Sequence, residues 1–431
     1  MIEKLLAPAP VYLQFDSRAG RHLLLSRHTR LFDLPPDGEF DAQAPAMIEL
    51  FERLGQASDG EVSLDTWSAP TPQSVSLNIS AGCNLACGYC YAGQGAFGGA
   101  QPKGMGWDIA RKTVDRLIDG ADPASPVTIG FLGGEPLVNR SLLHRVVNYA
   151  ADAGVSRERD VRFSVTTNGT LLDEADRMLF RRHRFAVTVS LDGDQQSHDR
   201  NRPTKSGKGS WAQAVANVAP LLADPGRAQI AARVTVTRTD LDLKRQFVGL
   251  VAAGFSEIGF SPLRKSVRAD DMIEGEAWVA YQAALIVVSK VELARLRSGL
   301  PIRLTNLAIA LKNIHRGASS PYPCGAGGGY FSVAADGDWY ACHRAIGQAD
   351  YRMGDVDALD TVHREQFLRN RHVDAQTDCT TCWARYLCSG GCHQEVEKRT
   401  AQSCDFVRGW LTFCLQSYCE LHLYDKEAAN V

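Results

Sequence analysis

The sequence lacks the features that would direct a protein to a membrane or out of the cell. Its start, Met1–Pro8, has no apolar segment followed by a small-residue cleavage site, so it does not form a secretory signal. No apolar run approaches the roughly 18 residues that suggest a membrane span. The formal net charge of −2 provides no broad positive field for nucleic acid or anionic lipid. We therefore expect a cytoplasmic protein with no nucleic-acid or membrane partner.

Cysteine is missing from more than half of the chain and is grouped in the rest. Residues 91–323 contain none, whereas three of the 12 cysteines lie within Cys83–Cys90 and nine within Cys324–Cys419. In a reducing cytoplasm such groups indicate metal or redox chemistry rather than a disulfide scaffold. With 431 residues, of which 45% are hydrophobic, the chain can bury a sizeable core in two or three domains.

Residues 71–265 alternate strand-like and helix-like patterns. The expected strands are Ser74–Ser80, Val127–Leu132, Val161–Thr166, Ala186–Ser190, Ile230–Thr237 and Glu257–Pro262. The expected helices include Trp107–Ile118, Leu142–Ala153, Glu174–Arg182, Trp211–Leu222 and Leu243–Ala253. Six such β/α units need parallel strands with right-handed helical crossovers, which predicts a closed or partly closed α/β barrel. In such barrels the chemistry lies at the carboxyl ends of the strands.

A small α+β module is expected before the barrel, over residues 1–70. Val11–Phe15 and His22–Leu25 predict a hairpin, and Ala44–Leu54 predicts a helix, with Pro45 tolerated in its first turn. After the barrel, residues 266–319 predict a helical linker that contains a long helix over Glu276–Arg297. Residues 320–431 are rich in Gly and Cys and show little regular pattern, as expected where metal sites replace a large apolar core.

The first cysteine group directly follows the first expected strand and consists of Cys83, Cys87 and Cys90. Three thiolates on a short loop can bind three irons of a [4Fe–4S] cluster and leave the fourth iron open. A fully ligated electron-carrier cluster would need a fourth cysteine nearby, and the sequence has none there. A zinc site is the alternative, although zinc prefers four ligands in paired two-residue spacings.

This spacing, with the aromatic Tyr89 before the last cysteine, resembles the radical S-adenosylmethionine (SAM) superfamily. The resemblance implies a partial (β/α)6 barrel and a reduced cluster that cleaves SAM to a 5′-deoxyadenosyl radical. Motifs at successive strand ends resemble the family's SAM-binding segments, with Glu135 near the amino group, Arg202 rather than Arg200 at the carboxylate, and Tyr89 near adenine. The expected SAM-contacting residues are Tyr89, Gly133, Gly134, Glu135, Thr167, Asn168, Ser190, Asp192 and Arg202.

The C-terminal cysteines resemble the SPASM extension of radical SAM enzymes, which carries two auxiliary [4Fe–4S] clusters. The resemblance implies a distal cluster on Cys379, Cys382, Cys388 and Cys404. It implies a nearer cluster on Cys324, Cys342 and Cys392. Zinc ribbons share the two-residue spacing but leave Cys324 and Cys342 unexplained. The cofactors expected for the chain are therefore SAM and three [4Fe–4S] clusters.

One iron of the nearer cluster is expected to lack a protein thiolate. Some relatives carry a further ligand where Tyr330 stands in this chain. That iron is then free to bind a substrate group, a water or nothing. Cys414 and Cys419 recur with apolar residues at helical spacing, which favours buried helix positions, and Cys414 stays open as a rival to Cys404.

The kind of radical chemistry follows only from resemblance. Anaerobic sulfatase maturases place an Asp directly after the cysteine equivalent to Cys342, and here that residue is His343, which is a weak candidate for a catalytic base. The segments around Cys324, Cys342 and Arg352 look instead like peptide maturases that form thioether or carbon–carbon cross-links, among them the type that matures quinohemoprotein amine dehydrogenase.

We therefore expect a peptide or small-protein substrate and formation of a thioether. Carbon–carbon (cyclophane) cross-linking and side-chain oxidation are the alternatives within the enzyme class, and a non-catalytic iron–sulfur electron carrier or scaffold is the alternative outside it. The expected electron donor is a flavodoxin or ferredoxin. The module over residues 1–70 either captures a leader segment as an added strand or serves as a lid or brace on the barrel.

Overall fold

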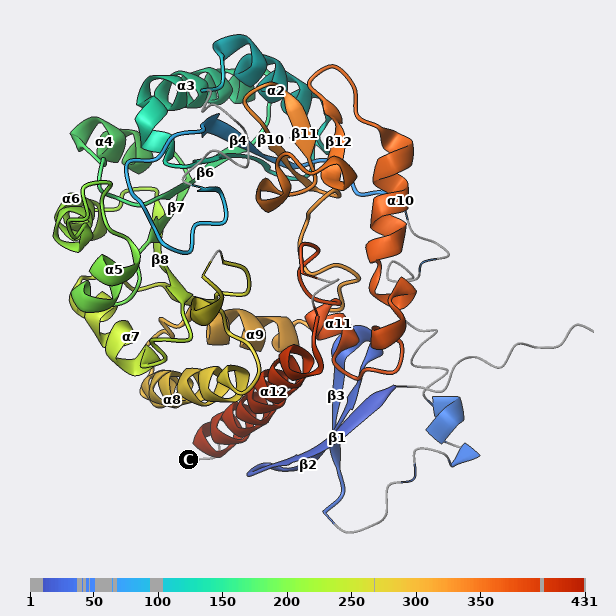
Figure 1. The fold of residues 1–431 in the computed structure, drawn as a ribbon. Coiled ribbons are helices and arrows are strands. Elements are labelled where there is room, and N and C mark those ends of the chain that lie inside the picture. Colours follow the sequence, from blue (N-terminus) through green and yellow to red (C-terminus); the bar gives the residue numbers. More distant parts are fainter. Residues whose placement is uncertain are drawn as a thin grey trace, which may run out of the picture.

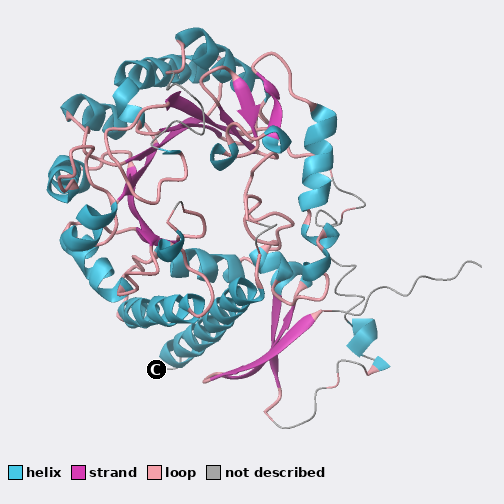
Figure 2. Ribbon diagram, in the orientation of Figure 1, coloured by secondary structure: helices cyan, strands magenta, loops and turns pink. Residues whose placement is uncertain are grey.

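The computed structural model describes residues 11–36, 41, 44–45, 47–50, 64, 68–93, 104–266, 268–395 and 399–429. A curved sheet forms the inner wall of an open ring, and helices line its outer side (Figures 1 and 2). The nine strands of this sheet follow the order β12-β11-β10-β4-β5-β6-β7-β8-β9. The expected α/β barrel is thus confirmed in a partly closed form.

The six central strands are parallel and run in chain order. Their bounds are β4 Ser74–Ser80, β5 Val127–Gly133, β6 Val161–Thr167, β7 Phe185–Ser190, β8 Gln229–Val236 and β9 Ile258–Pro262. The strands predicted from sequence are confirmed to within one residue at each end. The reason is a period-two pattern: Val75, Leu77 and Ile79 of β4 are fully buried and alternate with Ser and Asn residues, which is typical of a strand.

Helices connect these strands and cover the outer face of the sheet (Figure 1). Their bounds are α2 Trp107–Gly120, α3 Arg140–Ser156, α4 Glu174–Arg182, α5 Gln195–Asn201, α6 Trp211–Ala223 and α7 Leu243–Ala252. The five predicted crossover helices are confirmed, and α5 is additional. The sequence marks α4 most clearly, because Asp173 and Asp176 form a capping box at its start.

The expectation of little regular structure in residues 320–431 is wrong. β10 Tyr330–Val333 pairs in parallel with β4, and β11 Asp338–Tyr340 and β12 Arg352–Asp355 extend the same sheet with antiparallel pairing. The helices here are α10 Thr361–Arg371, α11 Arg385–Cys388 and α12 Ala401–Ala429. Strands of three or four residues carry almost no periodicity of their own, and partners distant in sequence stabilise them.

Three helices lie opposite the strands and complete the ring (Figure 1). They are α8 Ala277–Arg297, α9 Thr305–His315 and α12. An aromatic cluster joins α8 to α12, since Phe406 lies 5.1 Å from Trp278 and 5.2 Å from Tyr281 between ring centroids. Among the described helices, α8 is long and apolar enough to cross a membrane by length and composition alone, but Trp278 and Tyr281 are buried against the protein.

The N-terminal module contains a three-stranded antiparallel sheet of β1 Tyr12–Ser17, β2 Gly20–Leu25 and β3 Arg30–Leu34. The predicted hairpin is confirmed, and β3 was not predicted. The helix expected over Ala44–Leu54 is seen at residues 45 and 47–50, and the rest of it lies outside the described residues. Gln416 of α12 donates to the carbonyl of Asp16 at 2.8 Å, which ties the sheet to the C-terminal region.

Short 3-10 helices join the larger elements. Their bounds are η1 Arg27–Thr29, η3 Pro136–Asn139, η4 Ala269–Asp271, η5 His343–Ala345, η6 Ala349–Tyr351, η7 Val373–Ala375 and η8 Thr377–Cys379. Several of them lie next to cysteines, where the chain turns too tightly for regular helix or strand.

Candidate active site

The loop after β4 carries Cys83, Cys87 and Cys90, and none of the three forms a disulfide. Backbone bonds hold this loop against the segment that follows α5. The N–H of Ala86 donates to the Pro203 carbonyl at 2.8 Å, and the N–H of Gly88 donates to the Asn201 carbonyl at 3.1 Å. The loop therefore has a fixed shape at the carboxyl ends of the strands, where the barrel architecture places chemistry.

The thiols of this loop face one another in a partly buried setting. Burial raises the pKa of Cys87 to about 11, with Arg202 opposing the rise and the neighbouring thiols Cys83 and Cys90 adding to it. Burial also raises the pKa of Cys83. Thiolates packed this closely repel one another unless a cation lies between them, so this donor set fits a positively charged iron–sulfur core.

The end of β5 wraps tightly around the start of the cysteine loop. Gly133 has φ of +147°, and an added Cβ there would lie 2.2 Å from the Ser80 carbonyl oxygen, so only glycine fits. The N–H of Gly134 then donates to that same Ser80 carbonyl at 2.8 Å. The Gly133-Gly134 turn at the end of β5 was predicted as a SAM-binding segment. It also holds the start of the cysteine loop against the sheet.

Glu135 is 1% exposed, and its carboxylate accepts three hydrogen bonds. The donors are the Leu137 N–H at 3.1 Å, the Thr167 hydroxyl at 2.8 Å and the Asn168 N–H at 2.7 Å. Burial raises the pKa of Glu135, and these bonds oppose the rise. The carboxylate therefore braces the ends of β5 and β6 together, and its assignment to the SAM amino group stays a prediction.

Asn168 connects the end of β6 to the cysteine loop. Its Nδ2 donates to Asn84 Oδ1 at 2.9 Å and lies 3.9 Å from Cys83 Sγ. Thr170 completes the network, because it accepts from Asn84 Nδ2 at 2.7 Å and donates to Asn168 Oδ1 at 2.6 Å. Asn84 was not predicted as a site residue, although its place between the first two cysteines was a usable signal.

Tyr89, Asp192 and Arg202 form a buried network next to the cysteine loop. The Tyr89 hydroxyl donates to Asp192 Oδ2 at 2.5 Å, and Arg202 Nη1 donates to the Tyr89 hydroxyl at 2.7 Å. Asp192 also accepts from the Thr235 N–H at 3.1 Å. Arg202 Nε is buried without a hydrogen-bond partner among the described residues. A cationic, partly unpaired guanidinium beside the thiols fits a carboxylate ligand such as that of SAM.

The two candidate arginines differ sharply in environment. Arg202 is 8% exposed and contacts Tyr89, whereas Arg200 points to Asp240 at 3.2 Å and its side chain is 46% exposed. The structure therefore brings Arg202, and not Arg200, to the cysteine loop. Ser190 lies at the end of β7, two residues before Asp192, as expected. Tyr89 uses its hydroxyl within the network, and its contact with adenine stays a prediction.

Cys324, Cys342 and Cys392 come together at the edge of the sheet beside β10. Burial raises the pKa of Cys342 to about 11, and both other thiols add to that rise. We call these three thiols the near group. Tyr330 stands beside them: its hydroxyl is 3.2 Å from His343 Nδ1, and His343 Nδ1 is 4.0 Å from Cys342 Sγ. The three thiols predicted to share the nearer cluster are thus adjacent.

Cys379, Cys382, Cys388 and Cys404 form a second group, which we call the distal group. Burial raises the pKa of Cys388 to about 11, and the other three thiols add to that rise. They line a cavity of about 550 Å³. This is the predicted set of four, and iron binding at either group stays a prediction.

The remaining cysteines do not join either group. Cys414 is 0% exposed within the hydrophobic core, and burial alone raises the pKa of its thiol. Cys419 is buried in the same core. The helix positions predicted for both residues are confirmed, and the structure gives Cys414 no place as a rival to Cys404. Among the described residues, no three His, Cys, Asp or Glu side chains are placed to hold a single metal ion.

Tyr91, one residue after the last cysteine of the loop, lies between that loop and the near group. Tyr91 is 47% exposed and borders, together with Arg344, a cavity of about 250 Å³. Its ring contacts His343 edge-on at 6.0 Å and lies 5.7 Å from the Arg344 guanidinium. This residue was not predicted, because its contacts join segments more than two hundred residues apart.

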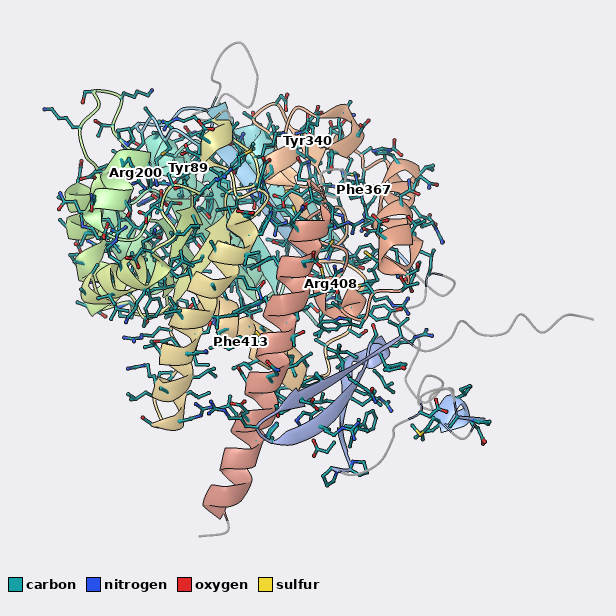
Figure 3. All side chains as sticks on the ribbon, turned by 60° about the horizontal axis from the view of Figure 1, so that its bottom comes forward. Tyr89, Arg200, Tyr340, Phe367, Arg408 and Phe413 are labelled. Carbon is teal, nitrogen blue, oxygen red and sulfur yellow. The ribbon has the colours of Figure 1, made fainter. Side chains whose placement is uncertain are left out.

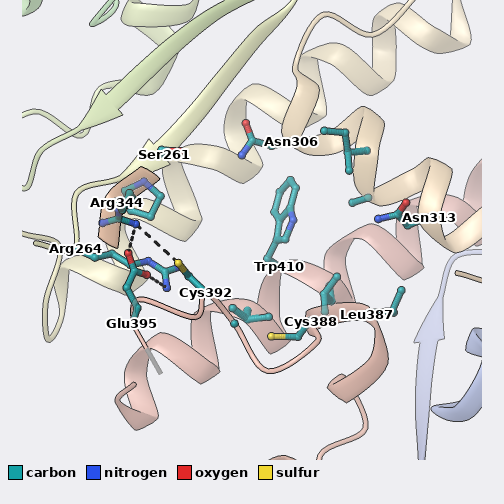
Figure 4. A pocket seen from close by; sticks show the side chains of 16 residues that line it. Ser261, Arg264, Asn306, Asn313, Arg344, Leu387, Cys388, Cys392, Glu395 and Trp410 are labelled. Carbon is teal, nitrogen blue, oxygen red and sulfur yellow. Dashed lines mark hydrogen bonds and ion pairs between the residues drawn. The ribbon is translucent and has the colours of Figure 1, made fainter. Parts of the chain in front are cut away.

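An ion-pair network lies between the barrel and the near group (Figure 4). Glu395 accepts from Arg344 Nη1 at 2.8 Å and from Arg264 Nη1 at 2.9 Å. Arg344 Nη1 also lies 3.9 Å from Cys392 Sγ. The network borders a pocket of about 460 Å³ between β9, α9 and α12, into which Trp410 projects. The network thus links the end of β9 to the near thiols.

Comparison with known proteins agrees with this geometry. Residues 77–222 match the family model of the radical SAM superfamily. The chain contains a radical SAM domain. Its relatives include a serine-type anaerobic sulfatase-maturating enzyme of Klebsiella pneumoniae, which is 26% identical over 75% of this chain and 82% of that protein. A cysteine-type anaerobic sulfatase-maturating enzyme of Clostridium perfringens is 24% identical over 80% of this chain and 94% of that protein.

Solved structures share the fold of this radical SAM enzyme. The structure of anSMEcpe with bound AdoMet superposes with a TM-score of 0.69 at 19% identity, covering 82% of this chain and 96% of that one. Streptococcus suis SuiB superposes with a TM-score of 0.55 at 12% identity, covering 92% and 97%. A radical SAM domain uses SAM and a [4Fe–4S] cluster, so the predicted class of enzyme is confirmed, and the number of clusters stays a prediction.

Proposed function

We propose that this radical SAM enzyme modifies a peptide or protein and joins a cysteine thiol of that substrate to a carbon as a thioether. The observation that carries the proposal is the near group, where three thiols converge and Tyr330 stands where a fourth would lie. A cluster bound there has one iron without a protein thiolate. That position suits a substrate thiol.

The residues around the cysteine loop have separate roles in this proposal. Cys83, Cys87 and Cys90 would hold a [4Fe–4S] cluster, which when reduced would supply the electron for cleavage of SAM to methionine and a 5′-deoxyadenosyl radical. Arg202 orients the SAM carboxylate through its unpaired Nε. The buried network of Tyr89 and Asp192 keeps that guanidinium in place and excludes water.

The near group is suited to hold a substrate thiol beside the radical. Tyr91 directly follows Cys90, and its ring lies 6.0 Å from that of His343, which directly follows Cys342, so the two cysteine segments lie side by side. Burial lowers the pKa of His343 to about 4, with Arg344 adding to the shift, so its imidazole is neutral near pH 7. An imidazole with so low a pKa is a weak base, so His343 is suited to hydrogen-bond next to Tyr330 rather than to take the proton of a substrate thiol. Holding thiol and carbon together can lower the barrier by several kcal/mol.

A peptide or protein substrate is supported by the relatives. The names of the Klebsiella and Clostridium proteins describe maturation of sulfatases. SuiB has been solved bound to a precursor peptide, SuiA, with a TM-score of 0.53 to this chain. The exposed edge of β3 fits capture of a leader segment by strand addition, and the sheet's contacts with α12 fit the alternative role as a brace.

Sulfatase maturation is the second candidate function, because the Klebsiella relative matches three quarters of this chain. The residue after Cys342 argues against it. His343 replaces the aspartate that the sulfatase-maturase resemblance would place there, and its low pKa means that it carries no charge near pH 7. The two functions leave different products, an aldehyde on one residue or a sulfur–carbon bond between two.

The test pairs two substitutions at one position in the anaerobically reconstituted full chain. Tyr330→Cys adds a fourth thiol to the near group, and Tyr330→Phe is the matched control that removes only the hydroxyl. The substrate is a Cys-containing peptide encoded beside the gene. We expect both variants to form 5′-deoxyadenosine from SAM, and only Tyr330→Phe to yield peptide that has lost two hydrogens. A Cys→Ser peptide should yield no product.

Other outcomes separate the alternatives. Product from Tyr330→Cys would show that the near group does not bind the substrate thiol, which leaves carbon–carbon cross-linking or oxidation. An aldehyde in the product would establish sulfatase-type maturation. Absence of 5′-deoxyadenosine from the unsubstituted enzyme would leave an electron carrier or scaffold. We further propose flavodoxin or ferredoxin as the electron donor, a cytoplasmic location, and domain limits at residues 70, 265 and 319.

A further inference from the structure

The distal thiol group lies in contact with two arginines. Arg399 Nη1 donates to Cys379 Sγ at 3.1 Å. Arg408, which projects from α12 (Figure 3), donates to the Cys382 thiol. Arg399 and Arg408 line the same cavity of about 550 Å³ as the four thiols, so both face the space between the thiols. Two positive charges therefore border the one cluster that has a full set of four thiols.

The near group has a different electrostatic surrounding. Its guanidinium, that of Arg344, lies 3.9 Å from Cys392 Sγ and is paired with Glu395 at 2.8 Å. The Glu395 side chain is 14% exposed, so its negative charge acts at close range with little screening. By contrast, the carboxylates paired with the distal arginines, Asp378 and Asp405, have side chains that are 78% and 68% exposed. Water screens them.

These differences act on the reduction potential of a cluster. Adding an electron makes a thiolate-bound cluster more negative, so nearby positive charge and hydrogen bonds to sulfur stabilise the reduced form. We propose that Arg399 and Arg408 set the reduction potential of the distal cluster above that of the near cluster, so that an electron shared between them resides on the distal one. The inference rests on the three-cluster assignment of the proposed function. It adds the direction of electron transfer, from the near cluster to the distal one.

The surrounding chain fixes Arg399 for this role. Its Nη1 also donates to the Gly390 carbonyl at 2.8 Å and to Gln376 Oε1 at 3.0 Å. Because these bonds also hold the loops that contain Gly390 and Gln376, Arg399→Gln risks a folding defect. Among the described residues, the partners of Arg408 are the Cys382 thiol and the exposed Asp405, so Arg408→Gln is the cleaner substitution.

The experiment uses the full chain with Cys83, Cys87 and Cys90 replaced by Ala, so that only the auxiliary clusters remain. The anaerobically reconstituted protein is titrated with dithionite at poised potentials and followed by EPR. Arg297→Gln is the matched control, since Arg297 lies at the end of α8, pairs with Glu420 at 3.5 Å and does not line the cavity of the distal thiols.

We expect two midpoint potentials, with the higher one lost when Cys379 and Cys382 are replaced by Ala. Arg408→Gln and Arg399→Gln should each shift the electron-sharing equilibrium toward the near cluster by at least tenfold, about 59 mV for one electron. Arg297→Gln should leave both potentials unchanged. Loss of the lower potential in the Cys379/Cys382 variant would overturn this proposal. Unchanged potentials in Arg408→Gln, with about eight irons bound, would also overturn it. Neither result would contradict the three-cluster assignment. Iron content near four in the starting protein would overturn the three-cluster assignment and this proposal with it.

Discussion

At the scale of single residues, buried charge is concentrated where the barrel strands end. Asp192 is 1% exposed, and burial raises its pKa while Arg202 and Tyr89 oppose the rise. A buried carboxylate and a buried guanidinium stabilise each other, and removing either one leaves the other uncompensated. The cost of holding this pair in the core is consistent with a role in binding a charged ligand.

Arg202→Gln should therefore lower both stability and SAM affinity. Arg202 is linked to Asp192 through the Tyr89 hydroxyl, and removing its charge leaves a buried carboxylate less well compensated, at a cost of about 1–3 kcal/mol. Arg200→Gln is the matched control. The Arg200 side chain, which pairs with Asp240, is 46% exposed, and exposed ion pairs contribute about 0–1 kcal/mol to stability. Thermal unfolding and equilibrium dialysis with SAM measure the two effects. Equal SAM affinities in the two variants would contradict the assignment of Arg202.

The residue scale also shows what the sequence could and could not predict. The groupings of the ten cysteines followed from the resemblance to radical SAM and SPASM proteins, and the choice of Arg202 followed from motif spacing; Arg202 lies beside Tyr89 of the cysteine loop. Tyr91 and Arg344 could not be predicted, because their roles depend on which distant thiol they approach. Glu135 was predicted to contact SAM. Its three hydrogen bonds show that its carboxylate also holds the ends of two strands together, which the sequence did not indicate.

At the scale of elements, α5 carries the turn that positions Arg202, and a polar network anchors it. Asp240 accepts from the Ser197 hydroxyl of α5 at 2.5 Å and from Arg245 Nη2 of α7 at 2.9 Å. The Asp240 side chain is 8% exposed. Burial alone would raise its pKa, but the bonds from Ser197 and Arg245 outweigh that effect and hold the pKa below its usual value. The position of α5 thus depends on the ionised carboxylate of Asp240.

Asp240→Asn should destabilise the protein by roughly 1–3 kcal/mol at pH 7, because Ser197 and Arg245 lose a charged acceptor. The folded-state pKa is lowered, so the stabilisation is present above the ordinary value of about 3.9 and fades as pH falls through the folded value. The difference between the variant and the parent protein should stay constant from pH 8 to pH 6 and shrink below about pH 4. Thermal unfolding across this range measures it, and a gap that widens toward acid would contradict the role of Asp240.

The elements differ in how far their own sequences specify them. Strands β4 to β9 were predicted because each is five to eight residues of mostly apolar, β-branched sequence followed by a crossover. β10, β11 and β12 have three or four residues each and depend on pairing with β4, which lies far away in the chain. Phe331 and Trp339 are buried only because that pairing forms.

At the scale of the whole molecule, one sheet joins the barrel to the cysteine-rich region. β10 pairs with β4 from Tyr330↔Ser74 to Val333↔Leu77, so the first barrel strand is an interior strand of the sheet. The domain boundary proposed at residue 319 separates the helical linker from the cysteine-rich sequence. In the structure, however, strands from both sides of that boundary belong to one continuous sheet. The near thiol group depends on this continuity, since Cys342 follows β11.

A fragment limited to residues 71–319 should aggregate. Without β10, the backbone groups of β4 become an unpaired sheet edge whose neighbouring side chains, Val75 and Leu77, are fully buried in the intact protein. The full chain should remain in solution under the same conditions. Size-exclusion chromatography of both proteins after identical expression measures the difference. A soluble, monomeric fragment would show that the barrel is an independent domain.

The last prediction concerns the iron content of the whole chain. Three spatially separate thiol groups imply three [4Fe–4S] clusters and about twelve irons per chain after anaerobic reconstitution. Replacing Cys83, Cys87 and Cys90 by Ala should remove about four irons and abolish 5′-deoxyadenosine formation, because the auxiliary groups lie apart from Arg202 and the strand-end network. Cys414→Ala is the matched control: its thiol is fully buried in α12 and has no neighbouring thiol that affects its pKa, so the iron content should not change. Iron loss from that variant would contradict the assignment of Cys404 to the distal group, and SAM cleavage by the triple variant would contradict the assignment of the first cysteine loop.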